Sequence, residues 1–312
     1  MNSTSHSLSC DYHLRGFIIP EWRTNFFTRE MFVAALISVT VVNLLVSPLT
    51  IFLNILVVLA VKTTLQLRNK SNVLLACLAG TYIISGAVGQ PLFIAELIYR
   101  LNGSPASEFC RIPYAARSFI RTSLMSSLLH LTFISIERYM SITFPFKYHD
   151  IVTKRRLSVS IVLVWSLVFL AIFFSIYKLS LLNFYFHALV IFLAIFIISF
   201  CRICRYHEAR KRIGNITTQS AKAKFLKEKK ALKTTSFVIG VVLLCFIPMT
   251  VFTIVSAFHI ISPDSLLAIE SCTLTLVLCN SVFYPVIHCT RSRGYRRAFK
   301  KLLRRVNYVQ AV

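Results

Sequence analysis

The chain has 312 residues, of which 56% are hydrophobic. Only 15% are charged, against about 25% in an average soluble domain. The 35 Lys and Arg residues outnumber the 11 Asp and Glu residues, which gives a formal net charge of +24. This composition, with 26 Phe, excludes a disordered chain, and the long charge-free runs exclude an ordinary soluble nucleic-acid-binding protein.

Seven apolar segments are long enough to cross a bilayer, which takes roughly 20 residues of helix. We expect these spans at about 33–61, 72–99, 110–142, 157–178, 184–206, 230–260 and 266–289. The segments before the first span have no evident signal-peptide cleavage site, so we expect the first span to be retained. The pattern predicts an all-α membrane protein: a seven-transmembrane helix bundle over residues 33–289.

The basic residues fix the orientation, because cytoplasmic loops are enriched in Lys and Arg. The loops after spans 1, 3 and 5, together with the C-terminal tail, contain 27 of the 35 Lys and Arg residues. We therefore expect residues 1–32 to be an extracellular tail and residues 290–312 to be cytoplasmic. Insertion bias alone explains much of this asymmetry; attraction to anionic lipid headgroups and acidic partners is the functional alternative.

The cytoplasmic tail carries a second pattern. Between residues 291 and 305, basic residues alternate with apolar ones at steps of three and four. This spacing predicts a short amphipathic helix on the inner membrane face. A disordered basic tail is the alternative.

Three of the nine cysteines, Cys10, Cys110 and Cys272, lie on the oxidising outer side, so at most one disulfide forms there within the chain. We expect Cys10 to pair with Cys272, and Cys110 is the rival partner. Asn2 begins an Asn-x-Thr sequence in the outer tail and is the better candidate for glycosylation. Asn102 begins a second, weaker one.

Single polar residues and prolines interrupt the apolar spans at particular places. Glu137-Arg138-Tyr139 lies at the cytoplasmic end of the third span, where an Arg can simply extend to the interface. Charged residues within a membrane are functional candidates by default. In the sixth span, Pro248 ends the sequence Cys-Phe-Ile-Pro and is expected to kink the helix. The seventh span contains Tyr284-Pro285 and His288.

In order and spacing, these residues resemble the motifs of class A (rhodopsin-like) G protein-coupled receptors from residue 33 to about residue 305. The matching positions are Asn54, Leu78, Ala79, Pro91, Glu137, Arg138, Tyr139, Trp165, Cys245, Phe246, Pro248, Pro285 and the helix-8 segment 295–303. The resemblance implies a plasma-membrane receptor that transmits binding of an extracellular ligand to heterotrimeric G proteins. It implies that the cytoplasmic ends of spans 3, 5 and 6 open on activation.

The same resemblance implies roles for individual residues. It assigns G protein coupling, and the contact that joins spans 3 and 6 in the inactive state (the inner lock), to Glu137, Arg138, Tyr139 and Glu228. The activation switch falls to Phe246, Pro248, Tyr284, Pro285 and His288. Loss of the Arg138–Glu228 contact is expected to raise basal signalling.

Several family positions are replaced in this chain. Phe246 stands where the family has a Trp, Tyr284 where it has an Asn, and His288 where it has a Tyr. The second outer loop is very short and lacks Cys, and the fifth span lacks Pro. These two features are similar in pattern to melanocortin-like receptors. The family's usual outer disulfide is therefore not expected.

The family's mid-bundle sodium site is also altered. Tyr82 occupies the position of the sodium-binding Asp, and no acid is expected at that depth. Sodium needs several oxygen ligands, one of them anionic, to offset its dehydration. We expect a sodium-free, hydrogen-bonded plug formed by Tyr82, Ser127, Asn280 and Tyr284. The alternative is that the two rings point to lipid.

The ligand class is constrained but open. Ile120 stands where the resemblance would place an amine-binding Asp, and Leu278 where it would place a retinal-binding Lys, which disfavours both ligands. The candidate pocket contains Glu96, Arg117, Ile120, Arg121 and Glu270. Its charges fit either a cationic site for an anionic ligand or a structural network in which the acids neutralise both arginines.

Two other functions remain as alternatives. One is a heptahelical membrane protein with atypical or no G protein signalling, because so many switch residues are replaced. The other is a transporter or channel, although no internal repeat is visible. The sequence has no metal-ligand spacing, nucleophile–base set or phosphate-binding loop, so we expect no enzyme and no cofactor.

Overall fold

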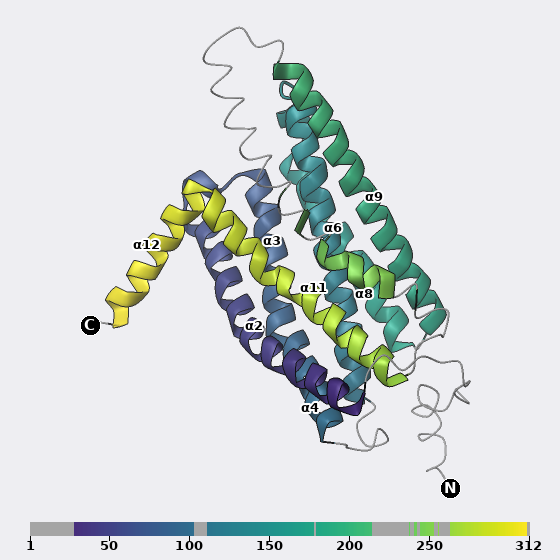
Figure 1. The fold of residues 1–312 in the computed structure, drawn as a ribbon. Coiled ribbons are helices and arrows are strands. Elements are labelled where there is room, and N and C mark those ends of the chain that lie inside the picture. The colour runs from purple at the N-terminus through teal and green to yellow at the C-terminus, as the bar shows by residue number, and fades with distance from the viewer. Residues whose placement is uncertain are drawn as a thin grey trace.

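The computed structural model describes residues 28–102, 111–177, 179–213, 237, 240–241, 244–252, 255 and 263–310. Over these residues the ordered structure is helical, and Figure 1 shows the helices gathered into an elongated bundle. The long elements are α2 (Arg29–Thr63), α3 (Lys70–Ile84), α4 (Gln90–Leu101), α6 (Arg111–Thr143), α8 (Lys154–Ile176), α9 (Ser180–Ile213), α11 (Pro263–Arg291) and α12 (Arg293–Gln310). Short elements are the 3-10 turn η1 (Leu65–Leu67), the π segment η2 (Ser85–Gly89) and α7 (Tyr148–Ile151).

In the described part of the chain, six helical segments are long and apolar enough to cross a membrane. They begin and end near the predicted spans 1 to 5 and 7, and most of the helices continue a few residues beyond the apolar core. Continuation costs little, because water or headgroups can satisfy the polar residues of the added turns. Of the predicted sixth span, the described residues, including the run 244–252, are helical.

Polar residues define where several helices begin. The Thr28 hydroxyl accepts a hydrogen bond from the Met31 amide (3.3 Å) ahead of α2. Asn69 does the same for the Asn72 amide (2.8 Å) ahead of α3. Such caps satisfy amides that have no partner within the first turn of a helix. The Asn69 cap begins the second span only a few residues after α2 ends at Thr63.

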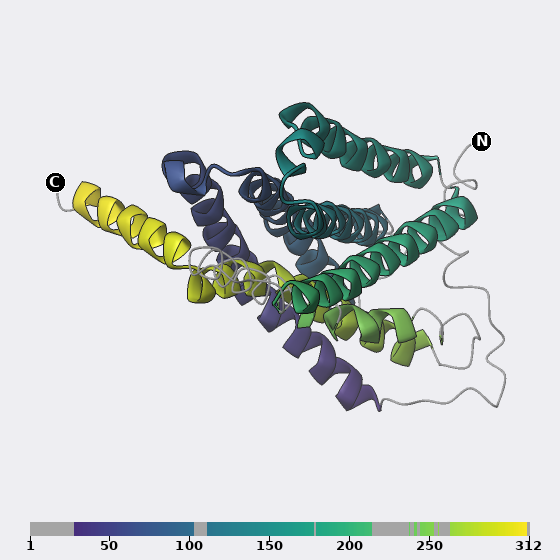
Figure 2. The ribbon, with the colours of Figure 1, turned by 90° about the horizontal axis from the view of Figure 1, so that it is seen from above.

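The helix α6 occupies the interior of the bundle and packs against α3, α4, α8 and α9. In Figure 2, α8 lies at the periphery. Its buried side chains form one narrow stripe at steps of four and three: Val164, Val168, Ala171 and Ser175. Many of the other apolar side chains of α8 are exposed, as expected of a helix that faces lipid on most sides.

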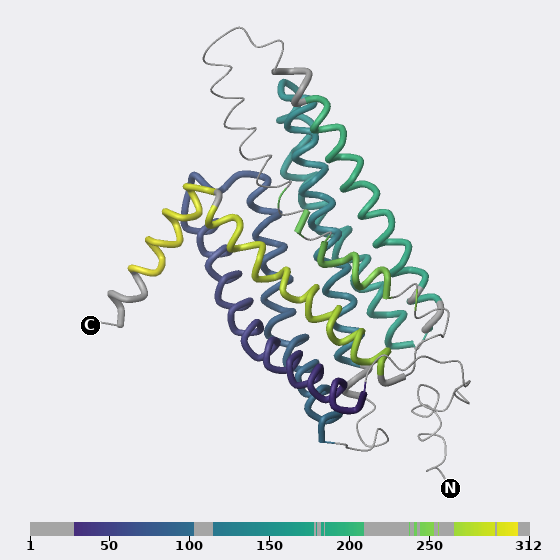
Figure 3. Tube along the Cα trace, viewed as in Figure 1, coloured from purple at the N-terminus to yellow at the C-terminus, as the bar shows by residue number. Residues whose placement is uncertain are grey.

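Polar contacts fasten α2 to α11, which Figure 3 traces side by side. The Asn43 amide nitrogen donates to Thr275 (2.8 Å), and the hydroxyls of Thr50 and Ser281 share a hydrogen bond (2.7 Å). The Asn54 amide nitrogen donates to the Ser281 carbonyl (2.9 Å). In a membrane these bonds join helices that gain little from hydrophobic contact with each other.

The final helix α12 leaves the bundle at the end of α11 and runs away from it (Figure 1). Three of its residues, Tyr295, Ala298 and Phe299, are buried in a cluster with the inner end of α2. Arg296, Arg297, Lys300 and Lys301 are exposed. This division gives α12 an apolar face against the bundle and a basic face away from it.

Candidate ligand and G protein sites

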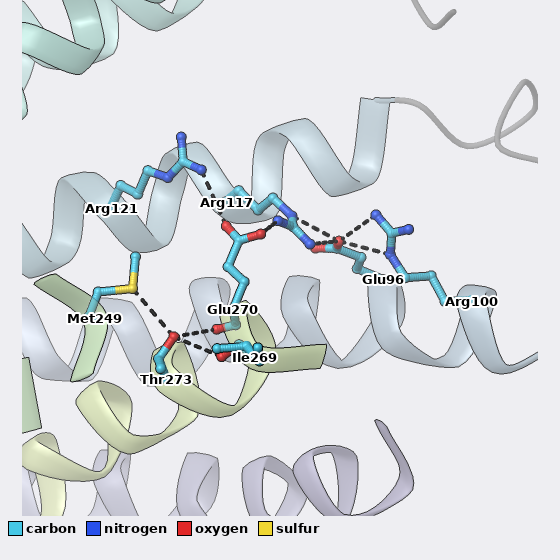
Figure 4. Close-up of polar contacts among 8 residues, drawn as sticks. All are labelled: Glu96, Arg100, Arg117, Arg121, Met249, Ile269, Glu270 and Thr273. Atoms are coloured by element: carbon cyan, nitrogen blue, oxygen red, sulfur yellow. Dashed lines mark hydrogen bonds and ion pairs between the residues drawn. The ribbon is translucent and has the colours of Figure 1, made fainter. Parts of the chain in front are cut away.

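Five charged residues form one network at the end of the bundle that is predicted to be extracellular, called the outer end below (Figure 4). Glu96 on α4 accepts hydrogen bonds from Arg100 (3.0 Å) and, across the helix interface, from Arg117 on α6 (2.9 Å). Arg117 also pairs with Glu270 on α11, and Glu270 accepts a further bond from Arg121 (3.3 Å). Positive and negative groups therefore alternate along the network, which links three helices that are distant in the sequence.

Burial differs along this network. Glu96 is only 1% exposed, and the side chain of Arg117 is 17% exposed. The Arg121 side chain, at the end of the network, is 50% exposed. Nε and Nη2 of Arg117 bond Glu96 while Nη1 bonds Glu270, so all three guanidinium nitrogens have carboxylate partners. Arg117 thus serves chiefly to hold helices together, whereas Arg121 retains unused donors.

Ile120, the other predicted pocket residue, is fully buried. It packs in an apolar cluster with Phe93 and Leu97 of α4 and Leu274 and Leu278 of α11. The position therefore presents hydrocarbon to its neighbours, one residue away from Arg121. The site has no carboxylate there that would pair with an ammonium group.

At mid-bundle, the Tyr82 and Ser127 hydroxyls share a hydrogen bond of 2.9 Å across α3 and α6. The Tyr82 and Tyr284 rings lie 6.2 Å apart, and both are buried inside the bundle. Among the described residues, the Tyr284 hydroxyl and both amide atoms of Asn280 have no hydrogen-bond partner. One of the expected plug contacts is therefore formed as a hydrogen bond, and the tyrosine rings point inward.

The expected switch residues continue this buried region toward the end of the bundle at which α12 begins. Phe246 packs in the same core cluster as Tyr82 and Tyr284. From Tyr284 a run of ring contacts leads to His288 (4.7 Å) and then to Tyr295 on α12 (5.7 Å). Pro285 lies inside α11, between Tyr284 and His288 in the sequence. Pro248 lies in the described helical run 244–252.

At the inner end, Glu137 is buried and has three neighbours. It accepts hydrogen bonds from the hydroxyls of Ser71 on α3 and Tyr148 on α7, and its Oε2 lies 3.7 Å from Nε of Arg138. The Tyr148 ring also receives the Lys70 ammonium at 5.2 Å. Burial and the bond to Glu137 raise the pKa of the Tyr148 phenol, so it remains a donor at physiological pH.

A buried cation, Arg205, lies on α9 near this end. Arg205 is 2% exposed, and its Nε donates to the Cys201 carbonyl (3.2 Å). Its two terminal nitrogens have no hydrogen-bond partner among the described residues. Arg138 and Arg205 therefore bring donor groups from the third and fifth spans to the end of the bundle that is predicted to be cytoplasmic.

Comparison with known proteins identifies the family. The chain matches the family model of the 7 transmembrane receptor (rhodopsin family) over residues 53–185 and 175–288, which is more than half of its length. It belongs to this receptor family. The chain is thus a multi-pass membrane protein with the predicted all-α seven-transmembrane bundle, and the predicted resemblance to rhodopsin-like receptors is confirmed.

Curated relatives of this rhodopsin-family chain include histamine H2 receptors. The protein of Rattus norvegicus is 29% identical over 293 residues, covering 85% of this chain and 78% of the relative. That of Canis lupus familiaris is also 29% identical, covering 86% and 80%. That of Homo sapiens is 28% identical, with the same coverage of 86% and 80%.

Some functional candidates emerge only from the structure of this receptor. Ser71 and Tyr148 lie far from Glu137 in the sequence or in another element, and neither forms a recognisable pattern with it. His187 on α9 is a lone His in an apolar span, buried with Nε2 unpartnered among the described residues. A His in a charge-free span was the available signal, because a buried imidazole needs hydrogen-bond partners.

Other predicted residues fall outside the described part of the chain. These are Glu228 of the inner lock, Cys10 of the disulfide, its rival partner Cys110 and the glycosylation candidate Asn2. Cys272 is described and lies exposed on α11. Tyr139, beside Arg138, is half-buried.

Proposed function

We propose that this chain is a plasma-membrane receptor that transmits an extracellular signal to heterotrimeric G proteins. Membership of the rhodopsin family supports the receptor function, and the inner-end geometry supports the coupling. The observation that carries the proposal is the arrangement around Arg138. Its neighbour Glu137 is held by Ser71 and Tyr148, so the guanidinium has a single described carboxylate partner at 3.7 Å.

Coupling requires an inner surface that recognises the G protein. Arg138 and Arg205 have guanidinium donors without described partners, which suits the backbone carbonyls or terminal carboxylate of an inserted segment. In the inactive state we place Glu228 against Arg138, so that spans 3 and 6 are joined. Outward movement of span 6 would then open the inner ends of spans 3, 5 and 6, with Phe246, Pro248, Tyr284, Pro285 and His288 as the moving contacts.

The ligand enters from outside in this proposal, between Glu96, Arg117, Ile120, Arg121 and Glu270. The relatives are named histamine receptors. In this chain, however, the position expected for an amine-binding Asp holds Ile120, whose side chain packs in an apolar cluster, so an amine ligand bound in that manner is disfavoured. Retinal is disfavoured by Leu278. The outer tail is proposed to carry a glycan on Asn2 and a Cys10–Cys272 disulfide, which non-reducing peptide mapping would detect.

The test is G protein dissociation measured with a panel of G protein subtypes in cells that express the receptor without added ligand. We expect basal activity above mock-transfected cells, an increase for Glu228→Ala and loss for Arg138→Ala. Arg155→Ala is the matched control, because Arg155 is exposed at the start of α8 and is also cytoplasmic. Surface expression is measured for each variant.

Two results would count against coupling. One is the absence of activity above the mock level for every subtype, including with Glu228→Ala, at normal surface expression. The other is equal activity of Arg138→Ala and the unmodified receptor. Either result would favour the alternative of a heptahelical protein with atypical or no G protein signalling.

A further inference from the structure

The outer ion network has a net positive charge that its own carboxylates leave unmatched. Three guanidinium groups, those of Arg100, Arg117 and Arg121, share two carboxylates, those of Glu96 and Glu270. Because the signs alternate, both ends of the network are positive. The excess charge therefore resides at Arg100 and Arg121 rather than at the central Arg117.

The two ends differ in what surrounds them. Arg100 donates two hydrogen bonds to Glu96 near the outer end of α4. Arg121 lies one turn further into the bundle than Arg117, and the described residues give it one partner, Glu270 at 3.3 Å. In Figure 4 one terminal nitrogen of Arg121 turns toward Glu270 and the other turns away. A guanidinium has five N–H donors, so Arg121 retains most of its capacity to bind an anion.

A second polar side chain lies on the same level, from α9. Met125 of α6 and Val190 of α9 share one buried cluster, and both helices are predicted to run from the outside inward. Arg121 and His187 each lie about one turn before these cluster residues in their own helices. They are therefore neighbours on the outer side of the cluster, and His187 is within electrostatic range of the Arg121 charge.

His187 is a buried group in this arrangement without a complete set of partners. The residue is 9% exposed, and Nδ1 lies 2.8 Å from the Asn183 carbonyl oxygen. A carbonyl only accepts, so Nδ1 carries the proton, and in the neutral ring Nε2 is an acceptor. Nε2 is buried and has no partner among the described residues. A buried acceptor of this kind calls for a donor.

We propose that the ligand of this receptor is a small organic carboxylate that carries a hydrogen-bond donor such as a hydroxyl. The carboxylate binds the free donors of Arg121, and the donor binds Nε2 of His187. Arg117 keeps its two glutamate partners and acts as a positioning residue for Glu270. This inference rests on the proposed function, because it assigns the chemical class of the ligand to that outer pocket.

The experiment measures binding without any G protein. The purified full-length receptor in lipid nanodiscs is heated, and unfolding is followed with a thiol-reactive dye, since Cys201 and Cys245 are buried free thiols. The probes are straight-chain carboxylates of increasing length and their 3-hydroxy derivatives, each beside the corresponding amide and amine. We expect hydroxy acids to raise the melting temperature by several degrees at saturating concentration, and the amides and amines to leave it unchanged.

Variants then test whether Arg121 is the cation that binds the carboxylate. Arg121→Gln should need at least about tenfold more acid for the same shift, because it loses charge-assisted hydrogen bonds. Arg121→Lys should retain part of the response, which distinguishes lost binding from lost folding. Arg100→Gln is the matched control, since it removes the same charge from the other end of the network, and its acid response should equal that of the unmodified receptor. His187→Phe should remove the preference for hydroxy acids over plain acids.

The proposal is overturned if no acid shifts the unmodified receptor, if amines shift it as much as acids, or if Arg121→Gln responds normally. These failures leave basal G protein dissociation untouched, because that assay contains no ligand. Conversely, the receptor could show no basal coupling and still bind hydroxy acids through Arg121. That result would contradict the signalling proposal and support the ligand assignment.

Discussion

A single phenol replaces a carboxylate at the centre of this receptor, and its hydroxyl is well partnered. Tyr82 is buried and shares a 2.9 Å hydrogen bond with Ser127. Tyr284 is buried as well, but its hydroxyl has no described partner. A paired buried hydroxyl stabilises the folded state, whereas an unpaired one carries a desolvation cost. We therefore expect loss of the hydroxyl to lower stability at Tyr82, and to leave stability unchanged or slightly higher at Tyr284.

We predict that Tyr82→Phe lowers stability by about 1 kcal/mol, the usual net contribution of one hydrogen bond. Tyr284→Phe is the matched control and should be neutral or slightly stabilising. The measurement is the melting temperature of the purified receptor, for which about 1 kcal/mol corresponds to a few degrees. An equal loss for both variants would show that the Tyr82–Ser127 bond is not the source of the effect.

The same replacement predicts the response to sodium. The proposed plug of Tyr82, Ser127, Asn280 and Tyr284 offers neutral oxygens but no carboxylate, and a dehydrated cation needs an anionic ligand in a medium of low dielectric. Basal activity should therefore be equal in sodium chloride and in the chloride of a bulky organic cation at the same concentration. A sodium-specific change of several-fold would refute the predicted loss of sodium control.

At the scale of elements, close packing of the second span against α2 depends on one glycine. A methyl group on Gly86 in η2 would lie 3.0 Å from a side-chain carbon of Ile51 and 3.3 Å from the Ser47 carbonyl oxygen. That carbonyl belongs to helical backbone and cannot move aside alone. Ser47 in turn donates to the Gly86 carbonyl (2.8 Å), which fixes the π segment to α2. Gly80 in α3 has no atom within 4 Å of a methyl group at its position.

Gly86→Ala should therefore lower the melting temperature, at a cost of about 1–3 kcal/mol for an overpacked contact. Gly80→Ala serves as the paired variant and should be neutral or stabilising, since Ala is the better helix former by about 1 kcal/mol. The comparison separates packing from helix propensity because both changes add one methyl to the same span. Equal melting temperatures for the two variants would contradict the close approach of η2 and α2.

The helices could be predicted from the sequence because the bilayer imposes length and apolarity on every span. Four charged residues of the outer network, Glu96, Arg117, Arg121 and Glu270, could also be singled out, since charges in apolar spans need partners. Arg100, the fifth, was not among them. The pairing within the network could not be predicted: which carboxylate meets Arg117 depends on how α4, α6 and α11 rotate against each other. His187 and Ser71 were missed for the same reason, because one side chain in a span has no spacing that reveals its neighbour.

Across the whole molecule, the outer ion network joins the second, third and seventh spans through one side chain. Arg117 lies between Glu96, which is almost completely buried, and Glu270. Removing the central cation takes one guanidinium partner from each of two carboxylates in a poorly solvated site, and leaves Glu96 with Arg100 alone and Glu270 with Arg121 alone. Loss of one partner from a buried ion pair typically costs 3–5 kcal/mol, roughly, because the remaining charge is left uncompensated.

We therefore predict that Arg117→Gln lowers the melting temperature by roughly 10 °C, whereas Arg100→Gln, which changes a side chain that is 32% exposed at one end of the network, changes stability by less than about 1 kcal/mol. The double variant Glu96→Gln with Arg117→Gln should recover part of the loss, since it removes the buried carboxylate that has lost Arg117 together with that partner. Measuring both single variants and the double variant gives the coupling free energy of the pair. Strictly additive losses would mean that Glu96 and Arg117 do not act together, and α4 would then be held to α6 by apolar packing alone.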